Sequence, residues 1–230
     1  MTRPRITIQG VDSTIEAVQF QSLAEVAAQN LRNAIIDGKL KPGERLVEQK
    51  LATQLDIGQP TLREALKELE HQGFVRKLAN KGTYVTKLSE DDCRKILQVR
   101  MVLEVLAIEQ AAANVNDSAM QDLEATVKEM DIAARKLERN RFHKADLAFH
   151  RRIWQLTDNE YLVAALERVV FSLFAFVLLV QDRKDFLAAV QQHREILEGL
   201  RSGDPKRAGE TFMQSTTKFW KERHHFSAGV

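Results

Sequence analysis

The chain has 230 residues, of which 44% are hydrophobic and 29% are charged, and its formal net charge is +2. This length suits two domains of ordinary size, and the composition favours a packed core over disorder. Because the net charge is close to zero, binding to nucleic acid has to depend on where the charges lie and not on their sum.

The cysteine content and the apolar segments indicate a cytoplasmic protein. A single cysteine, Cys93, excludes a disulfide framework within one chain and suits a reducing compartment. Residues 1–21 contain no apolar run typical of a secretory signal. The most apolar stretch, residues 169–180, is shorter than the about 20 residues that cross a bilayer. We therefore interpret it as a buried core helix and expect no membrane partner.

The first part of the chain alternates short helices with turns. Residues 1–21 are expected to form a flexible arm, and Ser22 with Glu25 then matches a capping box that opens a helix ending at Gly38. Two further helices are predicted over residues 47–55 and 60–71. Extended runs at 74–78 and 83–86 flank a turn with Asn80 and Gly82, which suit a hairpin. This order predicts a winged helix-turn-helix over residues 22–87.

After Thr86 the apolar spacing is helical almost to the end of the chain. Capping residues and breaks fall near Ser89 and near positions 116–117, 140, 158–159, 181–182 and 203–205. These breaks divide residues 88–226 into about six helices without a strand. The predicted fold class is therefore mainly α, with the winged helix-turn-helix followed by an all-helical bundle.

The third predicted helix has the features of a DNA recognition helix. Gln59 and Thr61 lie at its start, Arg63 lies one turn further, and Lys67 lies beyond. Arg63 can bond a guanine edge or a phosphate, and Gln59 can pair with adenine. Any one of these side chains alone fits an ordinary solvated surface, but the ordered set predicts binding to double-stranded DNA.

The predicted hairpin supplies a second contact with DNA. Its turn carries Lys81 and Gly82, and a basic tip beside a glycine can press against a phosphate or enter the minor groove.

Short motifs along both halves of the chain resemble a known family of bacterial regulators. In the first half they are Pro42-Gly43-Glu44-Arg45-Leu46, Glu48 with Leu51-Ala52, Thr61-Leu62-Arg63-Glu64-Ala65-Leu66, Gly73-Phe74-Val75 and Lys81-Gly82-Thr83-Tyr84-Val85. In the second half they are Arg100 with Leu103-Glu104, Asp146 with Phe149-His150, Asn159 with Leu162, His193 with Ile196, and Gly203-Asp204 with Ala208. The first set resembles the GntR family, and the second resembles the FCD ligand-binding domain of its FadR subgroup.

This resemblance implies a transcriptional regulator and not an enzyme. Members of the subgroup bind a pseudo-palindromic operator as a homodimer, and a small metabolite in the helical domain, mostly an organic acid, modulates the binding. Release of DNA on effector binding is the usual response, so we expect a repressor.

The metal hydrolase alternative would need a general base beside an open metal position, and the sequence lacks the histidine-glutamate signatures of such enzymes. A second alternative is a structural adaptor whose helical domain serves only for dimerisation.

Two positions depart from the family pattern at the DNA contacts. Family members commonly carry arginine at the places that are Gln59 and Gln49 here. Glutamine in place of a bidentate guanine reader shifts preference toward adenine or loses a phosphate contact. We therefore expect an operator that differs from the common one of the subgroup.

Three side chains of the second half are candidate metal ligands. Asp146 and His150 are four residues apart and share a helix face, and His193 comes from a later helix. A carboxylate with imidazoles suits zinc, nickel or manganese. The resemblance implies a fourth ligand, a histidine on the last helix, and that place is Ser215 here. His224 and His225 lie more than two turns further on.

The missing histidine leaves alternatives open for this site. The three residues either hold one divalent ion, with water or effector filling the gap, or they bind an organic effector directly without metal. Asp146 and His150 also fit a plain surface ion pair, with His193 as an ordinary helix histidine.

Arg100 is the fourth candidate effector-binding residue, since a guanidinium suits a carboxylate ligand. A salt bridge to Glu104 explains it equally well. Phe149 and Trp154 could line the cavity or belong to the core.

Overall fold

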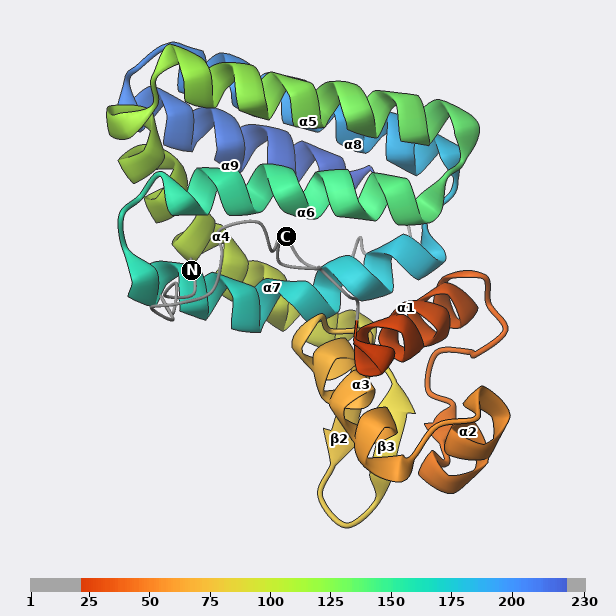
Figure 1. Cartoon of the computed structure of the whole chain (residues 1–230). Coiled ribbons are helices and arrows are strands. Elements are labelled where there is room, and N and C mark those ends of the chain that lie inside the picture. Colours follow the sequence, from red (N-terminus) through yellow and green to blue (C-terminus); the bar gives the residue numbers. More distant parts are fainter. Residues whose placement is uncertain (1–21, 223–230) are drawn as a thin grey trace, which may run out of the picture.

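The computed structural model describes residues 22–222, in two domains joined by a short connection. Figure 1 shows the helical bundle at the top and the smaller N-terminal domain below it, with the hairpin extending away from the bundle. The predicted arm at 1–21, the last residues of the predicted second domain, and His224 and His225 lie outside the described part of the chain.

The N-terminal domain has the predicted order of elements. These are α1 (Leu23–Ile36), β1 (Arg45–Leu46), α2 (Glu48–Leu55), α3 (Gln59–His71), β2 (Val75–Leu78) and β3 (Gly82–Val85). Ser22 and Glu25 form the expected capping box of α1. The apolar stripe of α3 is buried, and its members are Leu62, Ala65, Leu66 and Leu69. The exposed face of α3 is therefore free to meet DNA.

The sheet of this domain has three strands among the described residues, in the order β1-β3-β2, all antiparallel. The sequence predicted only the β2–β3 hairpin. Strand β1 has two residues, with Arg45 opposite Tyr84 and Leu46 opposite Thr83. Two residues are too few to show an alternating pattern, so sequence periodicity cannot detect this strand.

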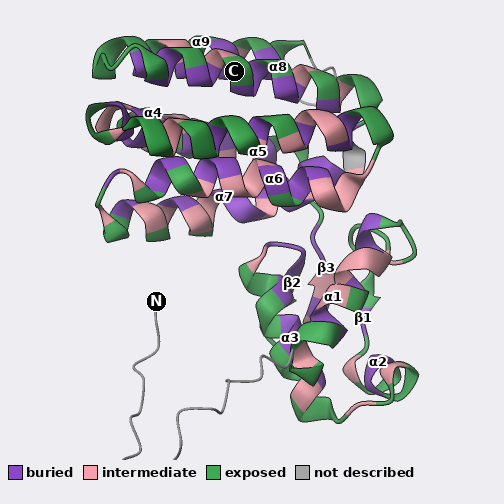
Figure 2. Cartoon of the chain, turned by 45° about the horizontal axis from the view of Figure 1, so that its top comes forward, coloured by how far each residue is buried: buried purple, intermediate pink, exposed green. Residues whose placement is uncertain are grey.

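The second domain is the expected bundle of six helices in the described part of the chain. They are α4 (Glu90–Asn114), α5 (Asp117–Lys136), α6 (Arg139–Gln155), α7 (Glu160–Val180), α8 (Arg183–Arg201) and α9 (Pro205–Lys221). Side chains of Ser89, Asn116, Asn159, Asp182 and Asp204 cap the starts of five of them. Figure 2 shows the buried positions of these helices facing the interior of the bundle.

Helix α6 starts without a side-chain cap. The turn before it places Leu137 in the left-handed region, with φ 56°, and the helix begins at Arg139. The break predicted near Asn140 therefore lies two to three residues earlier, because backbone geometry and not a capping side chain ends α5.

Helix α7 is longer than the apolar stretch that the sequence analysis considered. Within residues 22–222 it is the one helix whose length and composition would allow it to cross a membrane. The prediction that the apolar segment is too short to cross a bilayer was therefore wrong. Its place in the fold still agrees with a core helix, because it packs between α4 and α6 and buries Leu166, Val170 and Leu173.

Close contacts join the DNA-binding domain to the bundle. Gly73, just after α3, lies so near α7 that an added Cβ would stand 2.5 Å from the backbone of Phe171 and Ser172. The ring of Phe74 packs edge-on against His143 of α6, with centroids 5.3 Å apart. The domains therefore share a packed joint on α6 and α7.

Candidate functional site

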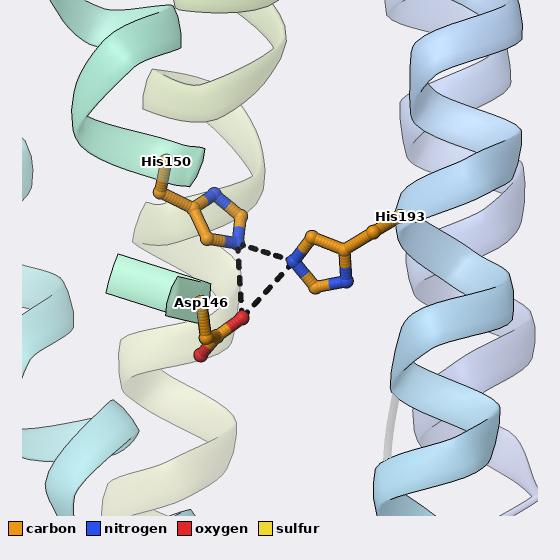
Figure 3. Close-up of side chains that lie close together, drawn as sticks. All are labelled: Asp146, His150 and His193. Carbon is orange, nitrogen blue, oxygen red and sulfur yellow. Dashed lines mark hydrogen bonds and ion pairs between the residues drawn. The ribbon is translucent and has the colours of Figure 1, made fainter. Parts of the chain in front are cut away.

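The candidate metal site brings together side chains from α6 and α8, as Figure 3 shows. Nε2 of His193 lies 3.0 Å from Oδ1 of Asp146 and 3.3 Å from Nε2 of His150. The third separation, between His150 Nε2 and Asp146 Oδ1, is 3.9 Å. His150 and His193 are buried, so Asp146 and His150 do not form a surface ion pair.

Contacts at the Nδ1 atoms fix the orientation of both imidazoles. Nδ1 of His150 lies 3.3 Å from Oε2 of Glu104, and Nδ1 of His193 lies 2.6 Å from the carbonyl oxygen of Ala189. A carbonyl and an ionised carboxylate only accept hydrogen bonds, so both Nδ1 atoms carry hydrogen and donate. In neutral rings each Nε2 therefore presents a lone pair toward Asp146.

This arrangement has the donor chemistry of a cation site. Two nitrogen lone pairs and one carboxylate oxygen converge within 4.8 Å. Three acceptors placed together repel one another unless a proton or a metal ion lies between them. The residues present therefore fit a divalent ion of the zinc, nickel or manganese type.

Asp146 is suited to stay ionised at this place. Burial raises the pKa of its carboxyl, but the adjacent imidazoles of His193 and His150 outweigh burial, and the pKa lies below its usual range. A carboxylate that remains charged is the form that binds a cation.

Glu104 is a site residue that the sequence analysis did not select as a candidate ligand. It is fully buried, accepts a hydrogen bond from Arg100 Nε at 2.9 Å, and lies 3.4 Å from Nε1 of Trp154. Burial raises the pKa of Glu104, but His150 and Arg100 outweigh it and hold the pKa at about 2. Its position four residues after Arg100, on the same helix face, was the signal available in the sequence.

Arg100 makes the salt bridge that the sequence analysis considered, and its role in effector binding stays a prediction. It pairs with Glu104, and it also lines the cavity beside the three candidate ligands, with its guanidinium 4.8 Å from the ring centre of Phe174. The cavity is small, about 40 Å³, and Gln192 adds an amide to its wall. Arg100 is therefore placed to meet an anionic group that enters the cavity.

Ser215 does not complete the ligand set. Its hydroxyl donates to the carbonyl of Phe212 within α9, and the residue is not among those lining the cavity. The neighbouring Thr216 accepts a hydrogen bond from Gln192. Phe149 and Trp154 are fully buried and also do not line the cavity, so they belong to the core.

His143 lines the cavity and was not predicted. It precedes Asp146 by three residues on α6, so it shares the helix face of the candidate ligands. Burial lowers its pKa to about 4, and the Asp146 carboxylate opposes this only in part. The ring is therefore neutral at physiological pH, and it also contacts Phe74 of the other domain.

The predicted recognition residues lie on one exposed face of α3. Gln59, Arg63 and Lys67 follow one another at intervals of four residues and are exposed, whereas Thr61 is half-buried at the helix start. Arg63 Nε donates to Oε2 of Glu48 on α2 at 2.8 Å. The arginine is thus held across the two helices.

The remaining predicted DNA contacts lie beside this face. Gln49 is exposed on α2. The turn of the hairpin has φ 60° at Asn80 and φ 102° at Gly82, and Lys81 between them is exposed. The hydroxyl of Tyr84 donates to the carbonyl of Lys81, which stabilises the turn.

Comparison with known proteins agrees with this architecture. The model of the bacterial regulatory proteins of the gntR family matches residues 23–85, and the FCD domain model matches residues 95–215. This chain belongs to the GntR family and carries an FCD domain. GntR regulators with an FCD domain form the FadR subgroup, and the family places this protein among transcriptional regulators and not among enzymes.

Similar curated proteins include two operon regulators. The chain is 25% identical to the probable D-xylose utilization operon transcriptional repressor of Paenarthrobacter nicotinovorans, over 96% of this chain and 97% of that protein. It is 30% identical to the Nta operon transcriptional regulator of Aminobacter aminovorans, over 70% of this chain and 88% of that protein.

Two solved structures share the fold of this GntR regulator. Escherichia coli McbR/YncC matches with a TM-score of 0.66 at 18% identity, covering 88% of this chain and 99% of that one. A putative GntR regulator from Rhodococcus sp. RHA1 matches with a TM-score of 0.65 at 24% identity, covering 90% and 99%. Both likenesses extend over the winged helix-turn-helix and the bundle together.

Proposed function

We propose that this protein is a cytoplasmic, homodimeric repressor that binds a pseudo-palindromic operator and responds to a small organic acid. In this proposal residues 22–87 bind DNA and residues 88–226 bind the effector and form the dimer. The observation that carries the proposal is the convergence of Asp146, His150 and His193 beside Arg100, in a cavity whose wall touches the DNA-binding domain.

Asp146, His150 and His193 would hold one divalent ion in this proposal. Such an ion, when bound, supplies open coordination positions for a carboxylate oxygen of the effector. Glu104 and the Ala189 carbonyl keep both imidazoles turned toward that place, and Arg100 meets the remaining negative charge. Without a histidine at Ser215, the chain offers three ligands, so affinity for the ion is expected to be modest.

Coupling to DNA runs through the joint between the domains. His143 lines the cavity and packs on Phe74, and Phe174 of the cavity wall lies one turn from Phe171, which meets Gly73 at the end of the recognition helix. A ligand that moves α6 or α7 therefore also moves α3. Coupling of this kind typically changes affinity by about 1–3 kcal/mol.

Helix α4 supports the proposed homodimer. It exposes Val99, Val102 and Leu106, which follow one another at helical spacing. The exposed fraction of Val102 is 71%, which is unusual for a branched aliphatic side chain on a monomer. A second copy of the chain packing on this stripe would bury it, and a symmetric dimer matches a pseudo-palindromic operator.

The DNA contacts can be tested with two alanine variants. Arg63→Ala should weaken operator binding by about 1–3 kcal/mol and relax base preference, whereas Lys81→Ala should weaken binding to all sequences alike. Both are measured by fluorescence anisotropy against the selected operator and scrambled DNA. Wild-type affinity in both variants would contradict the proposed docking.

Selection of binding sites from random DNA tests the role of Gln59 and Gln49. We expect an operator that differs from the common one of the subgroup, with adenine at the position that Gln59 reads. Recovery of the common operator unchanged would contradict this. Gln59→Arg should then shift the selected sequence toward guanine.

The cation site can be tested by elemental analysis of protein purified without chelator or affinity-column metal. A ratio near one ion per chain that falls in His193→Gln would support the proposal. A ratio near zero that persists after incubation with zinc, nickel and manganese would mean that the effector is bound without metal. In that case a thermal-shift screen of small carboxylates, compared with Arg100→Gln, tests direct binding. No shift by any compound would favour a helical domain that only dimerises.

A further inference from the structure

A second hollow lies between the two domains, outside the cavity of the candidate ligands. It is a cleft of about 490 Å³ between α1 and α3 of the DNA-binding domain and α6 of the bundle. The joint beside it is held by the amide of Asn140, which donates to Oδ1 of Asn33 at 3.0 Å. The cleft is more than ten times larger than the cavity of about 40 Å³ and falls in the size range of small-molecule sites.

The lining of this cleft is strongly cationic. Four of its side chains are basic, namely Arg32, Lys144, Arg151 and Arg152, and one is acidic, namely Glu68. His143 also lines it, as a neutral ring. The cleft therefore carries an excess of positive charge. Because the recess is partly shielded from solvent, the attraction between these cations and a bound anion is stronger than at an open surface.

Two of the four cations already have partners and two do not. Arg151 pairs with Glu167 at 3.0 Å, and Arg152 pairs with Asp122. Within residues 22–222 neither Arg32 nor Lys144 makes an ion pair within 4.0 Å or a side-chain hydrogen bond. The cleft thus holds one available guanidinium from the DNA-binding domain and one available ammonium from the bundle.

Arg32 is the more unusual of these two cations because it is half-buried. Its Nε is closed off from solvent and has no hydrogen-bond partner among the described residues, and the same holds for Oε1 of Gln72 beside it. Burial lowers the pKa of Arg32, and Glu68 counteracts this only in part. A guanidinium in such surroundings is a strong partner for a carboxylate or phosphate group.

We propose that this interdomain cleft is a second ligand site, which binds a small anion bearing carboxylate or phosphate groups between Arg32 and Lys144. The occupant bridges the two domains, since one cation belongs to α1 and the other to α6. It also touches His143, the residue that the cleft shares with the effector cavity. The site is independent of whether the first cavity binds a metal.

The test uses the full chain and two probes, succinate for carboxylates and pyrophosphate for phosphates, titrated by calorimetry. We expect at least one probe to bind, and Arg32→Gln or Lys144→Gln to weaken its binding by about tenfold or more. Lys128→Gln on α5 is the matched control, since it removes an exposed lysine that does not line the cleft and should leave binding unchanged. The probe that binds identifies the chemical class of the anion.

His193→Gln separates the cleft from the first cavity. Binding that persists in this variant and is lost in Lys144→Gln supports the cleft. Binding that is lost in His193→Gln and retained in Lys144→Gln assigns the probe to the first cavity and overturns the proposal. Absence of binding by both probes, or equal binding in Arg32→Gln, Lys144→Gln and wild type, also overturns it. Lys144 is exposed, so its variant is expected to fold even if Arg32→Gln does not.

Discussion

In the winged helix-turn-helix, Arg63, Lys67 and Lys81 are exposed, whereas in the bundle Arg100 is 4% exposed and Glu104 is 0% exposed. A solvated cation keeps its hydration until DNA arrives, so its cost to folding is small. A buried ion pair has to be complete within the protein before the chain is stable. In the proposed function, charged residues of the first domain therefore contribute to DNA binding, whereas the buried pair of Arg100 and Glu104 contributes both to folding and to the effector site.

The largest expected loss in unfolding free energy is that of Glu104→Gln. The change leaves Arg100 buried beside a neutral amide, and loss of one partner of a buried pair costs about 3–5 kcal/mol. Urea unfolding followed by circular dichroism measures it. Asp122→Asn breaks the exposed pair with Arg152 and should cost no more than about 1 kcal/mol. Equal losses in both variants would contradict the distinction between buried and exposed charges.

The second test is the dependence of stability on acid. Burial lowers the pKa of His143 from 6.5 to about 4, so between these values the unfolded chain binds a proton that the folded chain does not. This contribution is fully present above pH 6.5 and is lost as the pH falls toward 4, with a total of about 3 kcal/mol.

Replacement of the buried histidine checks this assignment. His143→Gln should flatten the decline in unfolding free energy between pH 6.5 and 4, measured by urea titration at each pH. His71→Gln, at an exposed histidine of the DNA-binding domain, is the control. A decline that survives in His143→Gln would show that another group causes it.

The third test concerns the joint between the domains. Gly73→Ala introduces a Cβ that would stand 2.5 Å from the α7 backbone, at a φ of +77°. Gly38→Ala has the same backbone problem, with φ +72°, but no atom lies within 4 Å of its Cβ. Left-handed strain costs each variant about 1–2 kcal/mol. Gly73→Ala should lose about 1–3 kcal/mol more in thermal unfolding, because a backbone clash is added. Equal losses would show that the domains separate easily.

The smallest expected effect is that of Glu48→Gln. Removal of this carboxylate releases Arg63 from an exposed ion pair, and such pairs are worth about 0.2–1 kcal/mol. Operator affinity should therefore rise by no more than about 1 kcal/mol in anisotropy titrations. A fall in affinity would mean that Glu48 holds Arg63 in its binding position.

Much of the fold followed from local chemistry in the sequence. Ser89, Asn159 and Asp204 marked helix starts because each satisfies backbone donors within its own turn. Strand β1 was missed because its two residues are defined only by a distant partner strand. The break before α6 was predicted two to three residues too late. Leu137 ends α5 by adopting a left-handed backbone conformation, and a leucine in the sequence gives no signal for that conformation.

The candidate site was predictable where residues share a helix and not where helices meet. Asp146 and His150 could be paired by spacing alone. The contact from Glu104 to His150 joins residues 46 positions apart, and only the packing of α4 on α6 creates it. His193 was selected because it belongs to the motifs that resemble the family. The interdomain cleft could not be predicted, because its lining residues come from separate helices and form no sequence motif.

The position of the two tryptophans has a practical consequence. The chain contains two tryptophans in all; Trp154 donates to Glu104 behind His150, and Trp220 lines the effector cavity. The tryptophan fluorescence of the protein therefore originates in the bundle, from Trp220 in the cavity wall and from Trp154 beside Glu104, and none of it comes from the DNA-binding domain. The protein carries a built-in optical reporter of its own cavity, so ligand entry can be followed in native, unlabelled protein, even while it is bound to an operator.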